Sequence, residues 1–195
     1  DCALTLFAAQ GYEGTSVREI IEAAGVTRPV LYYYCENKEH LFKRVVHWTH
    51  DDAHRDLEQA LSTVSGVVNQ LRVIIRGTFA FCAEDPRIPQ LMFQAAYGSA
   101  ASELAEFMQA QANLRFTIVA RVIQGGIDAG EVQQGDAAAL ALVFCSLMDY
   151  HANALSRMPS PETSLTEERA EALVAVFLHG VGTGRRKPPE LPPLT

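Results

Sequence analysis

The sequence has few cysteines, and no closely spaced pair among them. Cys2, Cys35, Cys82 and Cys145 lie far apart in a chain of 195 residues. Zinc ribbons and redox sites need cysteine pairs at short spacing, so the sequence predicts neither kind of site. Scattered cysteines of this kind are typical of free thiols in a reducing compartment, and we therefore expect a cytoplasmic protein.

Long apolar runs are also missing. The longest nearly unbroken run, Ala137 to Met148, covers twelve residues including one serine, whereas a membrane-spanning helix needs about 20. The composition is 48% hydrophobic and 20% charged, which is far from the composition of disordered chains. We expect a soluble globular protein with one substantial core or two small ones, and no membrane partner.

Basic residues are not in excess. The formal net charge is −7, and the first 47 residues hold five lysines and arginines against six acidic residues. Bulk charge therefore argues weakly against nucleic acid, and such a function must rest on where particular cations lie. The residues after Asp1 already have a helical pattern without an N-cap, so we expect that native residues precede this start.

The alternating pattern of a β-strand is missing from the whole sequence. Helical spacing of apolar residues is present in almost every segment, so the sequence predicts an all-α fold. The expected helices run to Gly11, from Ser16 to Gly25, from Thr27 to Tyr34 and from Lys38 to about Gly66, and then over 67–83, 87–97, 102–129, 137–155 and 165–181.

Local signals define the second and third of these helices. Ser16 and Glu19 have the spacing of a capping box, and Gly25 can end the helix that they begin. Thr27 can cap the next helix, with Pro29 in its first turn, where the missing N–H costs nothing. Two short helices thus meet across a turn of about three residues, which is helix-turn-helix spacing.

The segments GYEGTSVREI, AGVTRPVLYYY and NKEHLF, between Gly11 and Phe42, resemble the DNA-binding domain of the TetR (tetracycline-repressor) family of bacterial transcription regulators. The resemblance implies a three-helix helix-turn-helix DNA-binding domain over residues 1–47. It further implies a larger helical bundle for ligand binding and dimerisation over residues 48–184. Residues 185–195 contain too many prolines to fold and are expected to form a disordered tail.

The resemblance implies that the helix over Arg28–Tyr34 enters the major groove of DNA, with its N-terminal residues nearest the bases. Arg28 can then bind guanine through two hydrogen bonds. Adjacent residues of a helix point in different directions, so a core that holds all three tyrosines is disfavoured. The motif implies that Tyr32 is partly buried beside Leu31. The candidate DNA-binding residues are Ser16, Arg18, Thr27, Arg28, Pro29, Val30, Tyr32, Tyr33, Tyr34 and Lys38.

The helix after Asp136 is apolar on nearly every face, so packing within one bundle cannot bury all of it. A second surface is needed. The resemblance implies that this helix and the last helix form a four-helix interface with their two-fold mates in a homodimer. The expected interface residues are Leu140, Phe144, Leu147, Leu173, Val174, Phe177, Leu178 and Val181.

Large apolar residues are more numerous in the second half of the chain than helical stripes require. Most belong to an ordinary core, but methionine and aromatic side chains adapt to bound shapes, and helical bundles hold ligands between helices. Because few cations are near in sequence, the expected effector is mainly apolar or aromatic. The candidate pocket residues are Trp48, Phe79, Met92, Phe93, Tyr97, Phe107, Met108, Met148 and Tyr150.

Other constellations favour no chemistry. His47, His50 and His54 share a helix face, but successive turns of one helix rarely converge on one metal ion, so a solvated stripe is favoured over a metal site. Gly180, Gly182 and Gly184 mark the end of a helix instead of joining a strand to one, which disfavours a nucleotide site. The sequence specifies no nucleophile with a base, so we expect no catalytic residue and no cofactor.

Together these features predict a ligand-responsive DNA-binding transcription regulator. We expect a repressor that a mainly apolar small molecule releases from a palindromic operator. The alternatives are an all-helical enzyme or small-ligand carrier that does not use its helix-turn-helix, and a corepressor-like module that acts through the helical domain. Sequence-selective DNA binding separates the first interpretation from the others.

Overall fold

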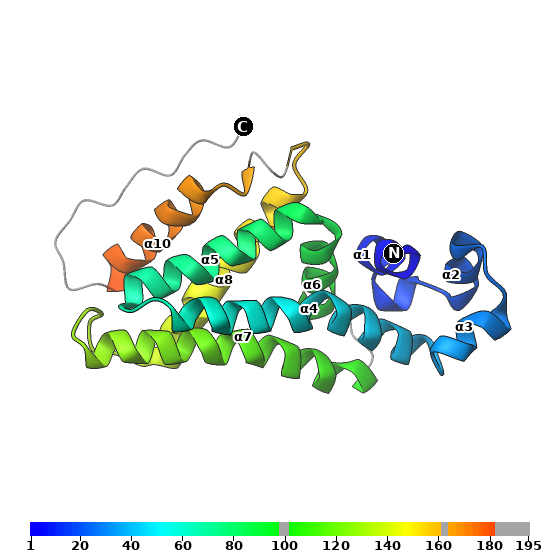
Figure 1. Ribbon diagram of the computed structural model, residues 1–195, viewed down its shortest axis with the longest axis horizontal. Helices are drawn as coiled ribbons and strands as arrows, with labels where there is room; N and C mark the ends of the chain where they lie inside the picture. The colour runs from blue at the N-terminus through cyan, green and yellow to red at the C-terminus, as the bar shows by residue number, and fades with distance from the viewer. Residues whose placement is uncertain (98–101, 161–163, 182–195) are drawn as a thin grey trace. The chain divides into compact units, whose positions relative to one another are not determined.

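Helices and their connecting turns make up the part of the chain that the computed structural model describes, residues 1–97, 102–160 and 164–181, and no strand occurs in these ranges. Side-chain positions are described for all of them except 50–52, 94–97, 102, 103, 105, 108 and 181. The helices are α1 (Cys2–Gly14), α2 (Val17–Ala24), α3 (Arg28–Tyr34), α4 (Lys38–Ser62), α5 (Val67–Glu84), α6 (Arg87–Tyr97), α7 (Ser102–Asp128), α8 (Ala137–Ser156) and α10 (Glu167–Val181) (Figure 1). The predicted all-α fold is confirmed.

Capping side chains explain why several helices begin near the residues that the sequence predicts. Asp136 caps α8 by accepting hydrogen bonds from the backbone N–H groups of Ala138 and Ala139, at 2.9 and 3.3 Å. Asn37 does the same for α4, where its Oδ1 lies 2.7 Å from the backbone nitrogen of His40. These side chains satisfy N–H groups that have no partner within the first helical turn.

Two helix ends differ from the prediction. The chain leaves helical geometry at Gly11, with φ 75° and ψ 175°, but then resumes it, so α1 extends past the kink to Gly14. Helix α4 ends at Ser62, earlier than the predicted Gly66, which instead precedes the first residue of α5. A glycine therefore marks a break in the helix at the first site and the start of the next helix at the second.

Contacts divide the chain into two compact units. The first unit contains residues Asp1–Ala53 and Arg87–Ala112, and the second contains His54–Pro86 and Asn113–Thr195. The first unit therefore includes α6 and the beginning of α7 beside the N-terminal helices. Sequence order alone does not indicate this addition, and the functional division at residue 47 stays a prediction.

The core of the first unit is an aromatic cluster between α1 and α4. Phe7 is fully buried, and its ring centroid lies 5.0 Å from that of Phe42 in an edge-to-face arrangement. Tyr12 packs edge-to-face on Phe42 as well, at 5.3 Å. Burial of side chains of this size is a main source of the free energy that holds the N-terminal helices together. The other buried apolar residues of this cluster are Ala3, Leu4, Ala8, Ile20, Val46, Leu91 and Leu104.

The second unit has a larger core, to which α5, α7, α8 and α10 each contribute an apolar face. The rings of Phe144 on α8 and Phe177 on α10 lie 5.2 Å apart at 66°. Gly126 on α7 lets the backbone approach Val67 closely, because a Cβ atom at position 126 would lie 2.8 Å from the Val67 Cβ. The fully buried side chains of this core include Leu71, Ile74, Ile75, Phe79, Phe144, Ile123 and Met148.

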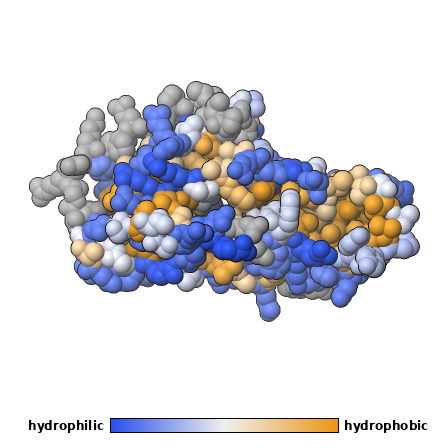
Figure 2. Space-filling model, in the orientation of Figure 1, coloured by the Kyte–Doolittle hydropathy of each residue, from blue (hydrophilic) through white to orange (hydrophobic). Residues whose placement is uncertain are grey.

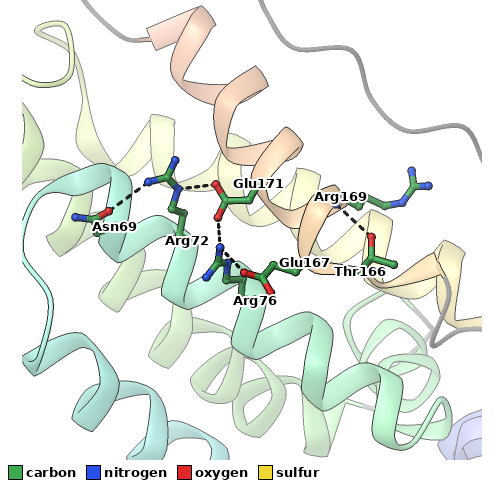
Figure 3. Close-up of polar contacts among 7 residues, drawn as sticks. All are labelled: Asn69, Arg72, Arg76, Thr166, Glu167, Arg169 and Glu171. Carbon is green, nitrogen blue, oxygen red and sulfur yellow. Dashed lines mark hydrogen bonds and ion pairs between the residues drawn. The ribbon is translucent and has the colours of Figure 1, made fainter.

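Ion pairs join α10 to α5 at the surface of the second unit (Figure 3). Arg72 donates from Nε to Glu171 at 2.6 Å, and Nη2 of Arg76 lies 2.6 Å from both Glu167 and Glu171. These side chains are partly exposed, so each pair contributes about 0.2–1 kcal/mol to stability. The pairs set the position of α10 on α5 more than they stabilise the fold.

Helix α8 is long and apolar enough to cross a membrane by length and composition alone, although its unbroken apolar run is shorter than the helix. The expected run stops at Met148, but the helix continues through polar residues to Ser156. Its buried residues, which include Phe144 and Leu155, pack in the core of the second unit. A core helix of a folded bundle passes the same length test as a membrane span.

Candidate nucleic-acid interface

The turn between α2 and α3 has a fixed backbone geometry. Gly25 adopts the left-handed conformation, with φ 63°, after the last residue of α2. Its N–H donates to the carbonyl of Glu22 at 3.3 Å, and the N–H of Val26 donates to the carbonyl of Ile21 at 3.2 Å. This pair of hydrogen bonds is a Schellman motif, which closes a helix and satisfies its last carbonyls. The turn therefore sets the angle at which α3 leaves α2.

A capping box begins α2 as predicted. The hydroxyl of Ser16 accepts from the backbone N–H of Glu19 at 3.2 Å, and the N–H of Ser16 donates to the Glu19 carboxylate at 2.8 Å. These hydrogen bonds hold the pKa of Glu19 below its ordinary value. Thr27, the residue before α3, makes no such side-chain bond, so its hydroxyl is not used by the helix start.

The side chains of α3 face solvent, and the helix contains no buried residue. Tyr33 is 82% exposed and Tyr34 is 61% exposed, with their rings edge-to-face at 5.0 Å. Tyr32, expected to be partly buried, is 41% exposed and thus less exposed than Tyr33 and Tyr34, and its ring centroid lies 6.0 Å from the Arg28 guanidinium. Arg28, Pro29, Val30 and the tyrosines are thus presented together.

The C-terminal end of α3 is anchored by two residues that the sequence reasoning did not select. Cys35 is 3% exposed, and both its N–H and its thiol donate to the carbonyl of Leu31, at 3.1 and 3.3 Å. Burial raises the pKa of this thiol, which keeps it neutral. Arg44 on α4 donates to the carbonyl of Tyr34. The only sequence signal for this contact was the position of Arg44, one to two turns after the start of α4.

Lys38, one of the predicted DNA-binding residues, also makes contacts within the protein. Its ammonium donates to the carbonyls of Tyr12 and Thr15, at 2.9 and 3.2 Å, and lies 4.1 Å from the centroid of the Tyr12 ring. The side chain therefore joins the start of α4 to the end of α1. An ammonium group has three N–H donors, so two carbonyls leave one for a phosphate. The phosphate contact itself stays a prediction.

Charge on this surface is nearly balanced. Arg18 on α2 pairs with Glu22 at 2.7 Å, and both side chains are mostly exposed, so the pair is weak and separates easily. Figure 2 shows hydrophobic surface, in orange, where Figure 1 labels α2, and paler surface toward α3. Apolar contacts and tyrosine hydroxyls, with few cations, are therefore what this surface offers to DNA.

The predicted pocket residues are divided between the two units. Phe79 and Met148 are buried in the core of the second unit. Trp48 and Tyr150 are 69% and 67% exposed, which corrects the expectation that they enclose a ligand, because each lies on a helix face that its unit does not cover. The side chains of Tyr97 and Met108 lie outside the described residues, and Met92, Phe93 and Phe107 are half-buried in the first unit.

The predicted dimer residues point mainly into the core of their own unit. Phe144, Leu173, Val174 and Phe177 are at most 4% exposed, so they hold α8 and α10 together within one chain, and the assignment of these four to the interface is wrong. Leu140, Leu147 and Leu178 pack partly buried against the same core, and the side chain of Val181 lies outside the described residues. The large apolar residues of α8 that are exposed are Leu142, Val143 and Tyr150.

Of the histidine stripe, His47 has a described ring contact. Its ring packs edge-to-face on Phe107, with the centroids 5.3 Å apart, within the first unit. The side chain of His50 lies outside the described residues. The contact gives His47 a packing role on α4.

Comparison with known proteins finds a family match for the N-terminal residues that contain α2 and α3. Residues 1–45 match the family described as bacterial regulatory proteins, tetR family. The HTH-type transcriptional activator FasR of Mycolicibacterium smegmatis is 30% identical over 95 residues, which are 49% of this chain and 43% of that protein. The chain thus spans less than half the length of this curated relative.

Solved structures share the fold of the whole chain. FadR from Bacillus subtilis, in complex with stearoyl-CoA, has a TM-score of 0.76 at 20% identity and covers 92% of this chain and 96% of its own. AibR, in complex with isovaleryl coenzyme A and operator DNA, has a TM-score of 0.72 at 20% identity over 90% and 93%. At this identity the likeness concerns the fold, an N-terminal helix-turn-helix domain with a helical domain. Residues 1–45 are thus similar to the tetR family of bacterial regulatory proteins, and the chain shares the fold of these solved regulators.

Proposed function

We propose that the protein is a transcription regulator that binds operator DNA through α3. The observation that carries the proposal is the exposed edge of α3, where Arg28, Val30, Tyr33 and Tyr34 project from a helix that buries none of its own residues. The major groove is wide enough for an α-helix, and Arg28 can bind the acceptors of guanine there. The capping box, the turn at Gly25 and the buried Cys35 hold this helix in one orientation.

The regulator acts as a homodimer on a palindromic operator. Leu142, Val143 and Tyr150 form an exposed apolar face on α8, which we call the α8 face. A second copy of the chain that covers the α8 face removes these side chains from water and supplies the two-fold symmetry that a palindrome requires. Helix α8 thus remains part of the interface, but it contacts the second copy through the α8 face and not through the residues predicted from the sequence.

A mainly apolar small molecule releases the protein from DNA. The second unit offers a methionine and an aromatic residue, Met148 and Phe79, in an apolar core that such a molecule can share. FadR and AibR, which share the fold, hold acyl-CoA ligands in their structures. An effector changes operator affinity only through its different affinities for two states of the protein, typically by about 1–3 kcal/mol.

Selection of duplexes from a random pool, followed by fluorescence anisotropy at moderate salt, tests the proposal. We expect one palindromic sequence to be enriched. Arg28→Ala should relax the preference at one base pair of each half-site, whereas Arg18→Ala, the matched variant on α2, should weaken binding to all sequences equally. Absence of any enriched sequence contradicts the proposal and favours an enzyme, a ligand carrier or a corepressor-like module.

A promoter reporter in cells decides the direction of regulation. A repressor gives higher expression when the gene is deleted and when an effector is added. FasR, the relative named above, is described as an activator, so the sign is a separate measurement. Lower expression on deletion contradicts the repressor part of the proposal and leaves its DNA-binding part intact.

A further inference from the structure

A polar cluster interrupts the core of the second unit between α5, α7 and α8. Arg115 on α7 donates from Nη2 to Asp149 on α8 at 2.6 Å. The thiols of Cys82 on α5 and Cys145 on α8 lie close enough to both charges to be shifted by them. Burial raises the pKa of Cys82 to about 12 and that of Cys145 to about 11, so both thiols are neutral.

One donor of this cluster has no acceptor. Among the described side chains, Nε of Arg115 is a buried nitrogen without a hydrogen-bond partner. A buried N–H that makes no hydrogen bond costs about 1–3 kcal/mol, more for a charged group. The Arg115 and Asp149 side chains keep 26% and 32% of their surface exposed, so the pair lies at the edge of the core, where a molecule can arrive from solvent.

The surroundings of this nitrogen define what can bind there. Asp149 already neutralises the guanidinium, and burial raises the pKa of Asp149 despite the nearby arginine. A second carboxylate at Nε would meet the negative charge of Asp149 at short range, which is unfavourable. A neutral oxygen accepts the hydrogen bond without this repulsion. The core of the same unit includes Phe79 and Met148, whose side chains suit a hydrocarbon chain or ring.

We propose that Nε of Arg115 is the polar anchor for the effector and that it selects a neutral carbonyl group, as in a ketone, ester, amide or thioester, on an otherwise apolar molecule. The inference rests on the proposed effector response and names the chemical class of that effector. Arg115 supplies the donor, and Asp149 excludes free carboxylic acids in their ionised form. The neutral thiols of Cys82 and Cys145 lie near this pair.

Titration calorimetry with matched probes tests this anchor. The probes are methyl alkyl ketones from methyl hexyl to methyl tetradecyl ketone, with the free acid, the methyl ester and the alkane of each length. At neutral pH we expect the ketone and the ester to bind about tenfold more tightly than the acid and the alkane. An affinity difference of about tenfold is the effect expected of one hydrogen bond to a charged donor. Equal affinities for ketone and alkane, or no binding of any ketone, overturn the proposal.

Three variants separate the anchor from a purely structural ion pair. Arg115→Lys keeps the charge beside Asp149 but not the Nε–H, so the preference for ketone over alkane should disappear. Asp149→Asn removes the repulsion, so the free acid should now bind about tenfold more tightly than the ester. Arg121→Lys is the matched control, because Arg121 is an exposed α7 arginine that pairs with Glu58. It should leave all preferences unchanged.

Operator binding distinguishes failure of the Arg115 anchor from failure of the proposed DNA-binding function. Folding of each variant is checked by circular dichroism and by its affinity for the selected operator without ligand. Normal operator affinity with unchanged ketone preference in Arg115→Lys overturns the anchor alone. If Arg115→Lys does not fold, Asp149→Asn decides, and an unchanged order of ester over acid in that variant overturns the anchor. Absence of operator binding in the unmodified protein contradicts the proposed DNA-binding function and leaves the probe preferences to be judged separately.

Discussion

Gly25 is the residue that fixes the turn between the two short helices. Its φ of 63° is strained for any residue with a Cβ, although a Cβ there would touch nothing within 4 Å. Gly25→Ala should therefore lower the free energy of unfolding by about 1–2 kcal/mol. Gly77→Ala on α5 is the control, because that glycine is helical with equally open space. It should raise the same free energy by about 0.5–1 kcal/mol.

Denaturant unfolding of both glycine variants measures these changes. A selective effect on the turn should also appear as weaker operator binding by Gly25→Ala under conditions where it remains folded. If both alanine variants stabilise the protein equally, the left-handed turn is not a constraint on the fold.

Lys38 joins α1 to α4, so its substitution should affect stability as well as DNA binding. Lys38→Ala leaves two backbone carbonyls without their charged donor and should cost about 1–3 kcal/mol of unfolding free energy. Lys43→Ala is the control, because the described contacts of Lys43 are with the Glu39 carboxylate on its own helix and with the Phe107 ring. Thermal unfolding compares the two variants.

The salt dependence of operator binding then isolates the second role of Lys38. Loss of one phosphate contact flattens the slope of log affinity against log salt by about one unit. If Lys38 contacts a phosphate, Lys38→Ala should show this flatter slope once its operator affinity is corrected for the fraction of folded protein. An unchanged slope together with lower stability assigns Lys38 to the fold alone, and unchanged stability contradicts the contact with the end of α1.

At the scale of helices, the packing of α7 against the start of α5 depends on one of two adjacent glycines. A Cβ at Gly126 would lie 2.8 Å from the Val67 Cβ, whereas a Cβ at Gly125 would meet nothing within 4 Å. Gly126→Ala should destabilise the protein by about 1–3 kcal/mol. Gly125→Ala should stabilise it by about 0.5–1 kcal/mol. Opposite signs in denaturant unfolding confirm the close approach, and equal signs contradict it.

Helix positions could be predicted from the sequence because their signals are local. Ser16, Asn37 and Asp136 each act within one turn of their own backbone, and Gly25 needs only its own φ. The face that α8 turns to its core could not be predicted in this way. The apolar residues of α8 occur on nearly every face of the helix, so their spacing did not distinguish Phe144 from Leu142. Only the contacts of α8 with α10 and α5 distinguish these two residues.

The candidate site was predictable in part for the same reason. Residues of α3 were found because the pattern of the helix-turn-helix is continuous in sequence. The contacts of Lys38 with Tyr12 and of Arg44 with Tyr34 join residues that no local pattern connects. The cluster of Arg115 with Asp149 and Cys82 joins residues from three helices. No local sequence pattern around any of the three residues indicates that they meet.

At the scale of the whole molecule, the α8 face predicts the state of assembly. Leu142 is 61% exposed, so Leu142→Glu should leave the chain folded and convert a dimer to a monomer. Leu114→Glu on α7 is the control, since Leu114 is 49% exposed on another helix of the same unit. Sedimentation equilibrium measures both. A stable dimer in Leu142→Glu contradicts the α8 face.

Phe177→Asp, in contrast, should unfold the second unit. Phe177 is 4% exposed and packs on Phe144, so a charge there is buried without a partner. Loss of helical signal in circular dichroism is the expected result. A folded monomer of this variant would return Phe177 to the interface.

The central claim is that two copies of α3 bind one palindromic operator, and a nuclease footprint of the full chain on the selected duplex tests it most directly. A two-fold dimer should protect two half-sites symmetrically, with recognition helices about 34–36 Å apart or slightly more, one helical turn of DNA. Arg28→Ala and wild type should protect the same span at saturating protein, because the variant changes base preference and not assembly. A symmetric footprint that Leu142→Glu abolishes agrees with the account. A single protected half-site, or protection that spreads without sequence preference, contradicts it.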